Sequence, residues 1–455
     1  MKKYPLIFSL LFSIAITQAQ ENPKIDKKTF FISPEGIENA KKAFEAAEKY
    51  YKKGFVFYNE ALKNYLNVYQ YNPASKELNY KIGACYLWTS ARKSSLPYLL
   101  NSTPEVAKDY YLLLGRSYQY NLKFAEAKEA YKSHMESLSK WKRLDSRKQY
   151  KQLIDECTAS ETLLKVDSAA VLIVNLGPVI NSNYDDYGAW LFEQDSSIYL
   201  TSKRPKRESA KKVSGIGSKE RILVSNNCIN QPSTYAMPVP KISSSKNISI
   251  AGVDRNKTGI YFYKGKRKTG QLMKAGYKGK TWKTNALKGR INHIAYKETS
   301  ISIASDSTAY YVTNRRGGEG GKDIWVCRQK KDNKFSKPYN LGKTINTSFD
   351  EEGVYVTPDG KTLYFSSKGR KGMGGFDVYK SEKQADGKWS EPKNLGHPIN
   401  SPADELFYHP TSDPNVALIS TIRDDSLGGL DIYKIQTGPG INKTIPTKEK
   451  PQTEE

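Results

Sequence analysis

Two polar residues recur at a fixed interval along the last two thirds of the chain: Asn292, Asn346 and Asn400, and Asp323, Asp377 and Asp431. Each interval is 54 residues, and the three segments align without gaps. A fixed period of this size is typical of repeat architectures, in which every copy is one supersecondary unit. A fourth copy begins near Asn181, about two periods before Asn292, so a diverged copy has to occupy roughly residues 230–282.

Each copy reads as four short strands separated by Gly, Asn and Asp turns. In the copy after Asn346 we expect strands at 353–357, 362–366, 376–381 and 388–393, with a hairpin turn at residues 358–361 (Pro-Asp-Gly-Lys). Four antiparallel strands repeated about five times are typical of a β-propeller. The sequence therefore predicts a propeller over residues 166–436 with five blades, six being the alternative count.

Closure of the ring can also be predicted. The last copy ends at Ile435 without a fourth strand, whereas residues 170–174 (Ala-Val-Leu-Ile-Val) precede the first copy and belong to no blade. We expect these residues to supply the missing strand, because pairing them with the last blade removes an exposed sheet edge.

Residues 35–165 have few strand signals and a strong 3.6-residue hydrophobic period. The pattern Tyr111-x-x-Leu114-Gly115-x-x-Tyr118, then Ala127 and Tyr131, matches a tetratricopeptide (TPR) repeat. An α-helical TPR solenoid is therefore predicted ahead of the all-β domain. Its concave groove would bind a peptide or a partner helix. By the repeat register it is lined by the candidate partner-binding residues Tyr80, Trp88, Arg116 and Tyr120. Core packing is the alternative role for these residues.

The termini predict export. Residues 1–19 combine Lys2 and Lys3, an apolar run and a small-residue cleavage site, as in a secretory signal peptide. A linker (20–34) follows, and residues 437–455 form a polar tail that we expect to be disordered. No later run is apolar and long enough to suggest a transmembrane segment. The predicted location is the periplasm, with association to the outer membrane through partners as a further option.

The net charge is +25, which raises the question of nucleic acid as a partner. Predicted export and the even spread of lysines argue against it and favour acidic envelope proteins or anionic polymers. The four cysteines form no C-x-x-C pair and the four histidines lack ligand spacing, so we expect no metal and no cofactor.

Two features of the repeats resemble parts of catalytic or phosphate-binding sites. Acid pairs recur at Asp185-Asp186, Asp350-Glu351 and Asp404-Glu405, and glycine-rich turns precede each repeated Asp. A catalytic pair would be unique, whereas these recur in successive copies, so we interpret them as acid–Arg bridges or turn caps. A phosphate loop ends at a helix N-terminus. These glycines lead into strands, so no catalytic residues are predicted.

An Arg also recurs eight residues before the repeated Asp, at Arg315 and Arg423. One copy has Gly369 at that position, followed by Arg370 and Lys371. This blade is expected to have lost its repeat Arg, and Arg370 and Lys371 are candidates for contact with an acidic partner.

The segments "PDGKTLYFSSKG…GGFDVY" and "SDSTAYYVTNRRGGEGGKDIW" resemble the WD40-like propeller repeats of TolB and tricorn-type proteins. The order of signal peptide, TPR and propeller resembles periplasmic envelope proteins of Bacteroidota, some linked to type IX secretion and gliding. Members of that group often end in an OmpA-like peptidoglycan-binding domain, which we do not expect here, because the last residues read as a polar tail.

The sequence thus predicts a non-enzymatic periplasmic scaffold or adaptor, whose partners are other envelope proteins in a secretion-type assembly. Two alternatives stay open: a propeller-based glycoside hydrolase, and a binder of anionic glycan or peptidoglycan. A hydrolase would need one cluster of acids or Arg confined to a single blade.

Overall fold

The structure is a computed structural model that describes residues 23–25, 30, 37–165, 171–192, 196–205, 219–226, 234–240, 242, 247–254, 259–266, 269–278, 281–331 and 334–438. The expected signal peptide, most of the expected linker and almost all of the expected tail lie outside these residues. Among the helices that the structure describes, none has the length and apolar character needed to cross a membrane.

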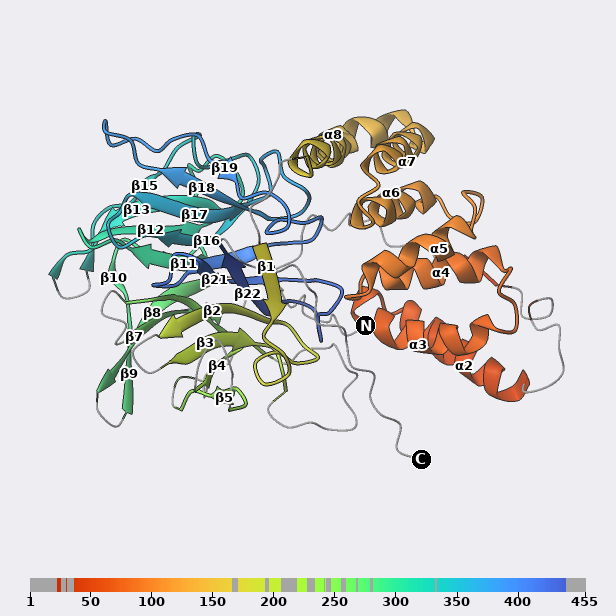
Figure 1. Cartoon of the computed structure of the whole chain (residues 1–455), viewed down its shortest axis with the longest axis horizontal. Coiled ribbons are helices and arrows are strands. Elements are labelled where there is room, and N and C mark those ends of the chain that lie inside the picture. The colour runs from red at the N-terminus through yellow and green to blue at the C-terminus, as the bar shows by residue number, and fades with distance from the viewer. Residues whose placement is uncertain are drawn as a thin grey trace.

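The N-terminal part is helical, and each helix packs mainly against its neighbour in sequence. Within the described residues it contains seven α-helices: α2 (Ile37–Tyr51), α3 (Tyr58–Tyr69), α4 (Lys76–Tyr86), α5 (Ser95–Leu100), α6 (Tyr110–Tyr120), α7 (Phe124–Ser137) and α8 (Lys140–Leu163). They form a stack beside the strands (Figure 1). The helical character of this region is as expected, while its identity as a TPR solenoid stays a prediction.

Two glycines set the close approach of successive helices. A Cβ on Gly83 of α4 would lie 2.7 Å from Leu99 Cγ of α5, and one on Gly115 of α6 would lie 2.6 Å from Tyr131 Cε1 of α7. Real Cβ atoms do not approach this closely, so both positions require glycine at this helix spacing. Leu99 and Tyr131 are fully buried in the gaps that these glycines leave open.

The C-terminal part is a propeller of five four-stranded antiparallel blades. From the innermost strand outward the blades are β2 (Asp186–Phe192), β3 (Ser197–Ser202), β4 (Arg221–Ser225) and β5 (Met237–Pro238); β6 (Ile248–Val253), β7 (Gly259–Lys266), β8 (Thr269–Lys278) and β9 (Thr281–Ala286); β11 (Glu298–Ile303), β12 (Thr308–Thr313), β13 (Asp323–Arg328) and β15 (Tyr339–Asn340); β16 (Glu351–Val356), β17 (Thr362–Ser367), β18 (Asp377–Glu382) and β19 (Lys393–Asn394); and β20 (Leu406–Pro410), β21 (Val416–Thr421), β22 (Asp431–Thr437) and β1 (Val171–Asn175). A short parallel ladder joins β10 (Lys288–Gly289) to β14 (Lys334–Phe335).

The predicted closure of the ring is confirmed. Strand β1 pairs antiparallel with β22, with Ile173 opposite Ile435 and Asn175 opposite Tyr433. The first strand of the region thus completes the last blade, and the count is five rather than six. The diverged copy forms the second blade, β6 to β9.

Strand lengths differ from the expectation only at the outer edge of the blades. The fourth strand of the fourth blade was expected over 388–393, but β19 covers only Lys393–Asn394, and Trp389 forms an isolated bridge with Lys383. The core lies between neighbouring blades. One buried cluster, for example, combines Val312 and Ile324 of the third blade with Val354 and Phe365 of the fourth.

Candidate partner-binding site

The repeated Asn joins each blade to the one before it. Asn400 accepts a hydrogen bond from the Val378 amide (2.8 Å) and donates one to the Val378 carbonyl (2.9 Å), so its side chain pairs like a strand residue. Asn346 makes the same two bonds with Ile324 of the preceding blade. The side-chain amides of both Asn residues are buried and fully hydrogen-bonded, so their role is structural.

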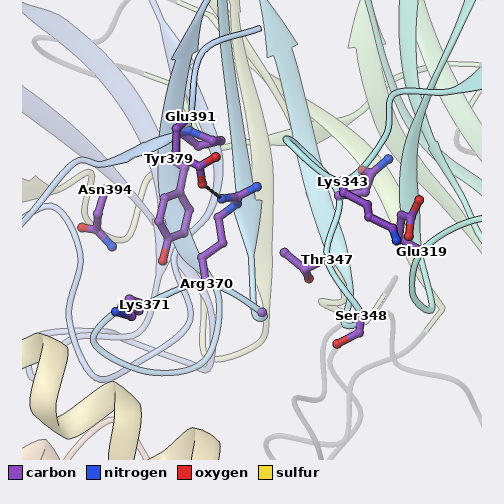
Figure 2. Close-up of a pocket in the computed structure, with 12 residues that line it drawn as sticks. Glu319, Lys343, Thr347, Ser348, Arg370, Lys371, Tyr379, Glu391 and Asn394 are labelled. Carbon is purple, nitrogen blue, oxygen red and sulfur yellow. Dashed lines mark hydrogen bonds and ion pairs between the residues drawn. The ribbon is translucent and has the colours of Figure 1, made fainter.

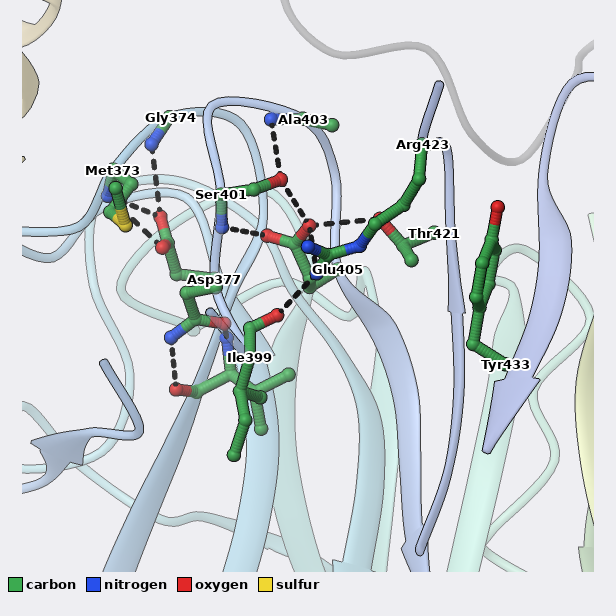
Figure 3. Close-up of polar contacts among 12 residues, drawn as sticks. Met373, Gly374, Asp377, Ile399, Ser401, Ala403, Glu405, Thr421, Arg423 and Tyr433 are labelled. Carbon is green, nitrogen blue, oxygen red and sulfur yellow. Dashed lines mark hydrogen bonds and ion pairs between the residues drawn. The ribbon is translucent and has the colours of Figure 1, made fainter. Parts of the chain in front are cut away.

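The two acids of each pair have different structural roles, and Figure 3 shows the second acid, Glu405, with its partners. The first acid reaches the preceding blade, since Asp404 accepts from the Phe376 amide at 2.9 Å. The second acid caps its own turn, since Glu405 accepts from the amide and hydroxyl of Ser401 at 2.9 and 2.6 Å. Arg423 lies 3.5 Å from Glu405. The interpretation of these pairs as turn caps and acid–Arg bridges fits this geometry.

The repeated Asp fixes the glycine-rich turn that precedes it. The Asp377 carboxylate accepts hydrogen bonds from the Met373 amide (3.0 Å) and the Gly374 amide (3.2 Å). Burial raises the pKa of Asp377, the neighbouring Glu405 raises it further, and these amide donors lower it. Asp323 holds its own turn in the same way through Gly320.

The second glycine of each turn is required by the next blade. Gly375 has φ +63°, and a Cβ there would collide with Asp404 Oδ1. The equivalent Gly321 and Gly429 would collide with Asp350 and Asp185, respectively. The glycines therefore admit the carboxylate of the following blade, and no phosphate is needed to explain them.

We expect Gly375→Ala to lower the free energy of unfolding by about 2–4 kcal/mol, because it adds backbone strain and displaces the Asp404 contact. Gly387→Ala is the matched control, since Gly387 also has positive φ (+80°) but has open space around the position of a Cβ. The control should cost only about 1 kcal/mol. Urea denaturation of both variants measures the difference, and equal losses would contradict this account of the glycine.

The turn of the fourth blade also joins the propeller to the helices. The Met373 carbonyl accepts hydrogen bonds from Gln119 Nε2 of α6 (2.9 Å) and Ser160 Oγ of α8 (3.4 Å). The Met373 side chain is fully buried in a helical cluster that contains Leu112, Phe124, Tyr131, Tyr150, Leu153 and Cys157. The helices thus already hold one turn, which belongs to the chain's own propeller.

Further contacts surround this junction. Gln152 of α8 donates to the Lys368 carbonyl at 2.7 Å, and Lys93 pairs with Asp424 of the last blade at 2.7 Å. The Tyr131 hydroxyl donates to Gln119 Oε1 at 2.7 Å, which orients the amide so that its NH₂ group meets Met373. Side-chain donors that bind backbone carbonyls can hold loops of many sequences, because every residue has a backbone carbonyl whatever its side chain.

The four predicted groove residues lie in different places. Tyr80 is fully buried and donates a hydrogen bond to Asp109 at 2.5 Å, so the expectation that it faces a groove is wrong. Its hydroxyl thus reaches the loop that precedes α6. Trp88 is 36% exposed and stacks on Phe55 with ring centroids 4.7 Å apart.

Arg116 and Tyr120 lie on the side of α6 that faces the propeller. Burial opposes the charge of Arg116, but Tyr131, Tyr120, Glu156 and Asp404 outweigh it and raise the pKa of the guanidinium. Tyr120 accepts a hydrogen bond from Arg92 Nη1 at 3.1 Å, and the guanidinium lies over its ring.

Arg370 and Lys371 line a surface cleft of about 820 Å³ between the third and fourth blades (Figure 2). Arg370 Nη2 donates to the Ile345 carbonyl at 3.1 Å, just as Arg423 Nη2 donates to the Ile399 carbonyl at 2.8 Å. The expectation that this blade had lost its repeat Arg is therefore wrong, because Arg370 reaches the same place from the next residue. Lys371 is exposed, and Lys343 lines the opposite side of the cleft.

Sequence reasoning missed Met373 and its helical partners. The repeat alignment did not distinguish Met373, because the equivalent residues are Glu319 and Leu427, and Leu427 is apolar as well but is 42% exposed. Among the described residues, no three His, Cys, Asp or Glu side chains are arranged to hold a metal ion.

No protein-family model matches the sequence, and no curated protein matches it either. Among solved structures, the chain is similar to a protein assigned as TolB from Agrobacterium tumefaciens (14% identity, TM-score 0.36, 60% of this chain and 86% of that one). It is also similar to prolyl oligopeptidase B from Galerina marginata (8% identity, TM-score 0.30, 52% and 30%). Both TM-scores are low, and the five blades are defined by the strand pairing of this chain itself.

Proposed function

We propose that the chain is a non-enzymatic scaffold or adaptor of the cell envelope, in which a TPR-type helical repeat and a five-bladed propeller act as one unit. The observation that supports this proposal is the burial of Met373 of the propeller in the helical region. Helical side chains hold a turn of the other module by bonds to its backbone and by burial of one side chain. This is how a protein-interaction module engages its partner.

The use of the acids supports the absence of catalysis. The paired acids of successive blades share the same structural partners, so the described blades offer no single asymmetric pair for acid–base chemistry. The glycine turns are likewise accounted for by contacts between blades. The location that we propose is the periplasm, as part of a secretion-type assembly, and the partners are other envelope proteins.

The cleft of the fourth blade is the proposed contact for an acidic partner. Lys371 and Lys343 stand on its two sides, and Thr347, Ser348 and Asn394 add neutral polar groups. Two acids, Glu319 and Glu391, also line the cleft, and Arg370 pairs with Glu391 at 2.7 Å, so the three cations exceed the acids by one charge. An anionic glycan such as peptidoglycan is the other occupant that this cleft favours, because the lysine and hydroxyl side chains of the cleft would bind a glycan as well as an acidic protein.

Crosslinking in native envelopes, followed by affinity recovery of the tagged mature chain, tests the proposal. We expect one or a few envelope proteins to be enriched, and the yield to fall several-fold for the Lys343→Glu, Lys371→Glu double variant. A double variant at exposed propeller lysines outside the cleft, Lys283→Glu and Lys288→Glu, should retain the yield. Recovery of no protein above a tag-only control would contradict the adaptor. Cosedimentation with purified sacculi in its place would support the glycan.

A further inference from the structure

The first half of α8 concentrates positive charge and exposed apolar side chains. Residues 140–151 contain one acid, Asp145, and six cations: Lys140, Lys142, Arg143, Arg147, Lys148 and Lys151. Trp141 is 82% exposed and Leu144 is 56% exposed. A tryptophan with this exposure is unusual, because its ring normally drives burial in a core or at an interface.

The charge pattern of this helix start opposes helix stability. The positive end of a helix dipole favours acids, yet the first turn of α8 contains Lys140, Lys142 and Arg143 and no acid. The N-cap, Ser139, makes no side-chain hydrogen bond to the helix. The segment therefore combines two sources of positive potential, which an external anionic surface would offset.

Helical spacing separates this patch from the side of α8 that the fold uses. Trp141 and Leu144 are three residues apart, and Lys140, Arg147, Lys148 and Lys151 follow the same side at helical intervals. Tyr150, Leu153 and Cys157 lie on another side and are buried. Among these cations, Lys148 lies over the Phe349 ring and Lys151 pairs with Asp155. The later part of this side contacts the propeller, at Lys148 and also at Gln152, which binds the Lys368 carbonyl, so the basic and apolar patch is confined to residues 140–147.

We propose that the start of α8 docks on a membrane surface that contains anionic phospholipid headgroups. Clusters of Lys and Arg beside Trp and Leu on an amphipathic helix suit such a surface, since the ring lies at headgroup level and the cations meet the phosphates. This inference goes beyond the adaptor function and does not depend on it.

Flotation of the mature chain with lipid vesicles tests the docking. We expect binding to vesicles of phosphatidylethanolamine with phosphatidylglycerol, and little binding when phosphatidylcholine replaces the anionic lipid. The Lys140→Glu, Lys142→Glu, Arg147→Glu variant should bind at least about tenfold more weakly, because each cation near an anionic surface contributes to affinity. Trp141→Ala should weaken binding several-fold, and added salt should weaken the binding of the unaltered chain.

The matched control reverses three exposed propeller lysines, Lys283, Lys288 and Lys330, which changes the net charge equally. It should retain binding, which separates a local site from the overall charge. Equal losses in both triple variants would overturn the proposal, as would equal binding to neutral vesicles. Absence of vesicle binding, with an acidic peptide such as polyglutamate bound at this patch instead, would overturn it in favour of a protein partner. Circular dichroism of each variant shows that α8 remains folded.

Discussion

Met373→Asp is expected to release the helical region from the propeller. The substitution removes a fully buried side chain and places a carboxylate among apolar helical residues. Loss of a buried Met side chain costs about 2–5 kcal/mol, and the uncompensated charge adds to that cost. The expected results are a longer maximum dimension in small-angle scattering and faster proteolysis near the junction.

The matched control is Leu427→Asp, because Leu427 occupies the equivalent turn of the last blade but is 42% exposed. It should leave the scattering profile and the proteolysis rate unchanged. Met373→Ala should give an intermediate effect, since it removes the buried side chain without introducing a charge, while the backbone carbonyl that Gln119 and Ser160 bind is present in both variants. A Met373→Asp chain that scatters like the unaltered protein would contradict the assigned role of this loop.

The second large effect is a loss of stability as pH rises from about 5 to about 8. Burial raises the pKa of Glu298 to about 8, and burial raises the pKa of Glu351 to about 7. In the unfolded chain the pKa of a glutamate is about 4.3, so the folded state holds these protons more tightly. Their contribution to stability is complete below the unfolded pKa and is lost as pH rises through the folded values.

Each such carboxyl lowers the free energy of unfolding by up to about 1.4 kcal/mol per pH unit within this window. Urea denaturation across the window should therefore show the lowest stability at the alkaline end. Glu351→Gln should flatten the profile, because the amide is neutral at every pH. Glu391→Gln in the same blade should not, since that side chain is 78% exposed. A stability that rises across the window would contradict the assignment.

The propeller was predictable because each blade packs against its neighbours through the same recurring residues. The recurring Asn joins each blade to the one before it and the recurring Asp holds a turn within its own blade, so both residues return once per blade, every 54 residues. The closing strand was predictable by elimination, because one apolar segment lacked a blade and the last blade lacked a strand. The second blade was placed only roughly, since it carries neither residue at the expected spacing.

The junction was not predictable from the repeats, because it depends on where two modules meet. Tyr80 follows the same register as residues expected in the groove, yet it is fully buried and its hydroxyl binds Asp109. Arg370 stands one residue past the repeat position, and only its reach to the Ile345 carbonyl identifies it as the repeat Arg. Spacing records the order of residues but not the length and direction of a side chain.

Proximity labelling in the native envelope tests the adaptor proposal most directly. A labelling enzyme fused to the mature chain should mark a small, reproducible set of envelope proteins, and the set should change when Met373→Asp separates the two modules. An exported labelling enzyme without the chain provides the background. A labelled set identical to that background would contradict the proposal that this protein joins envelope partners.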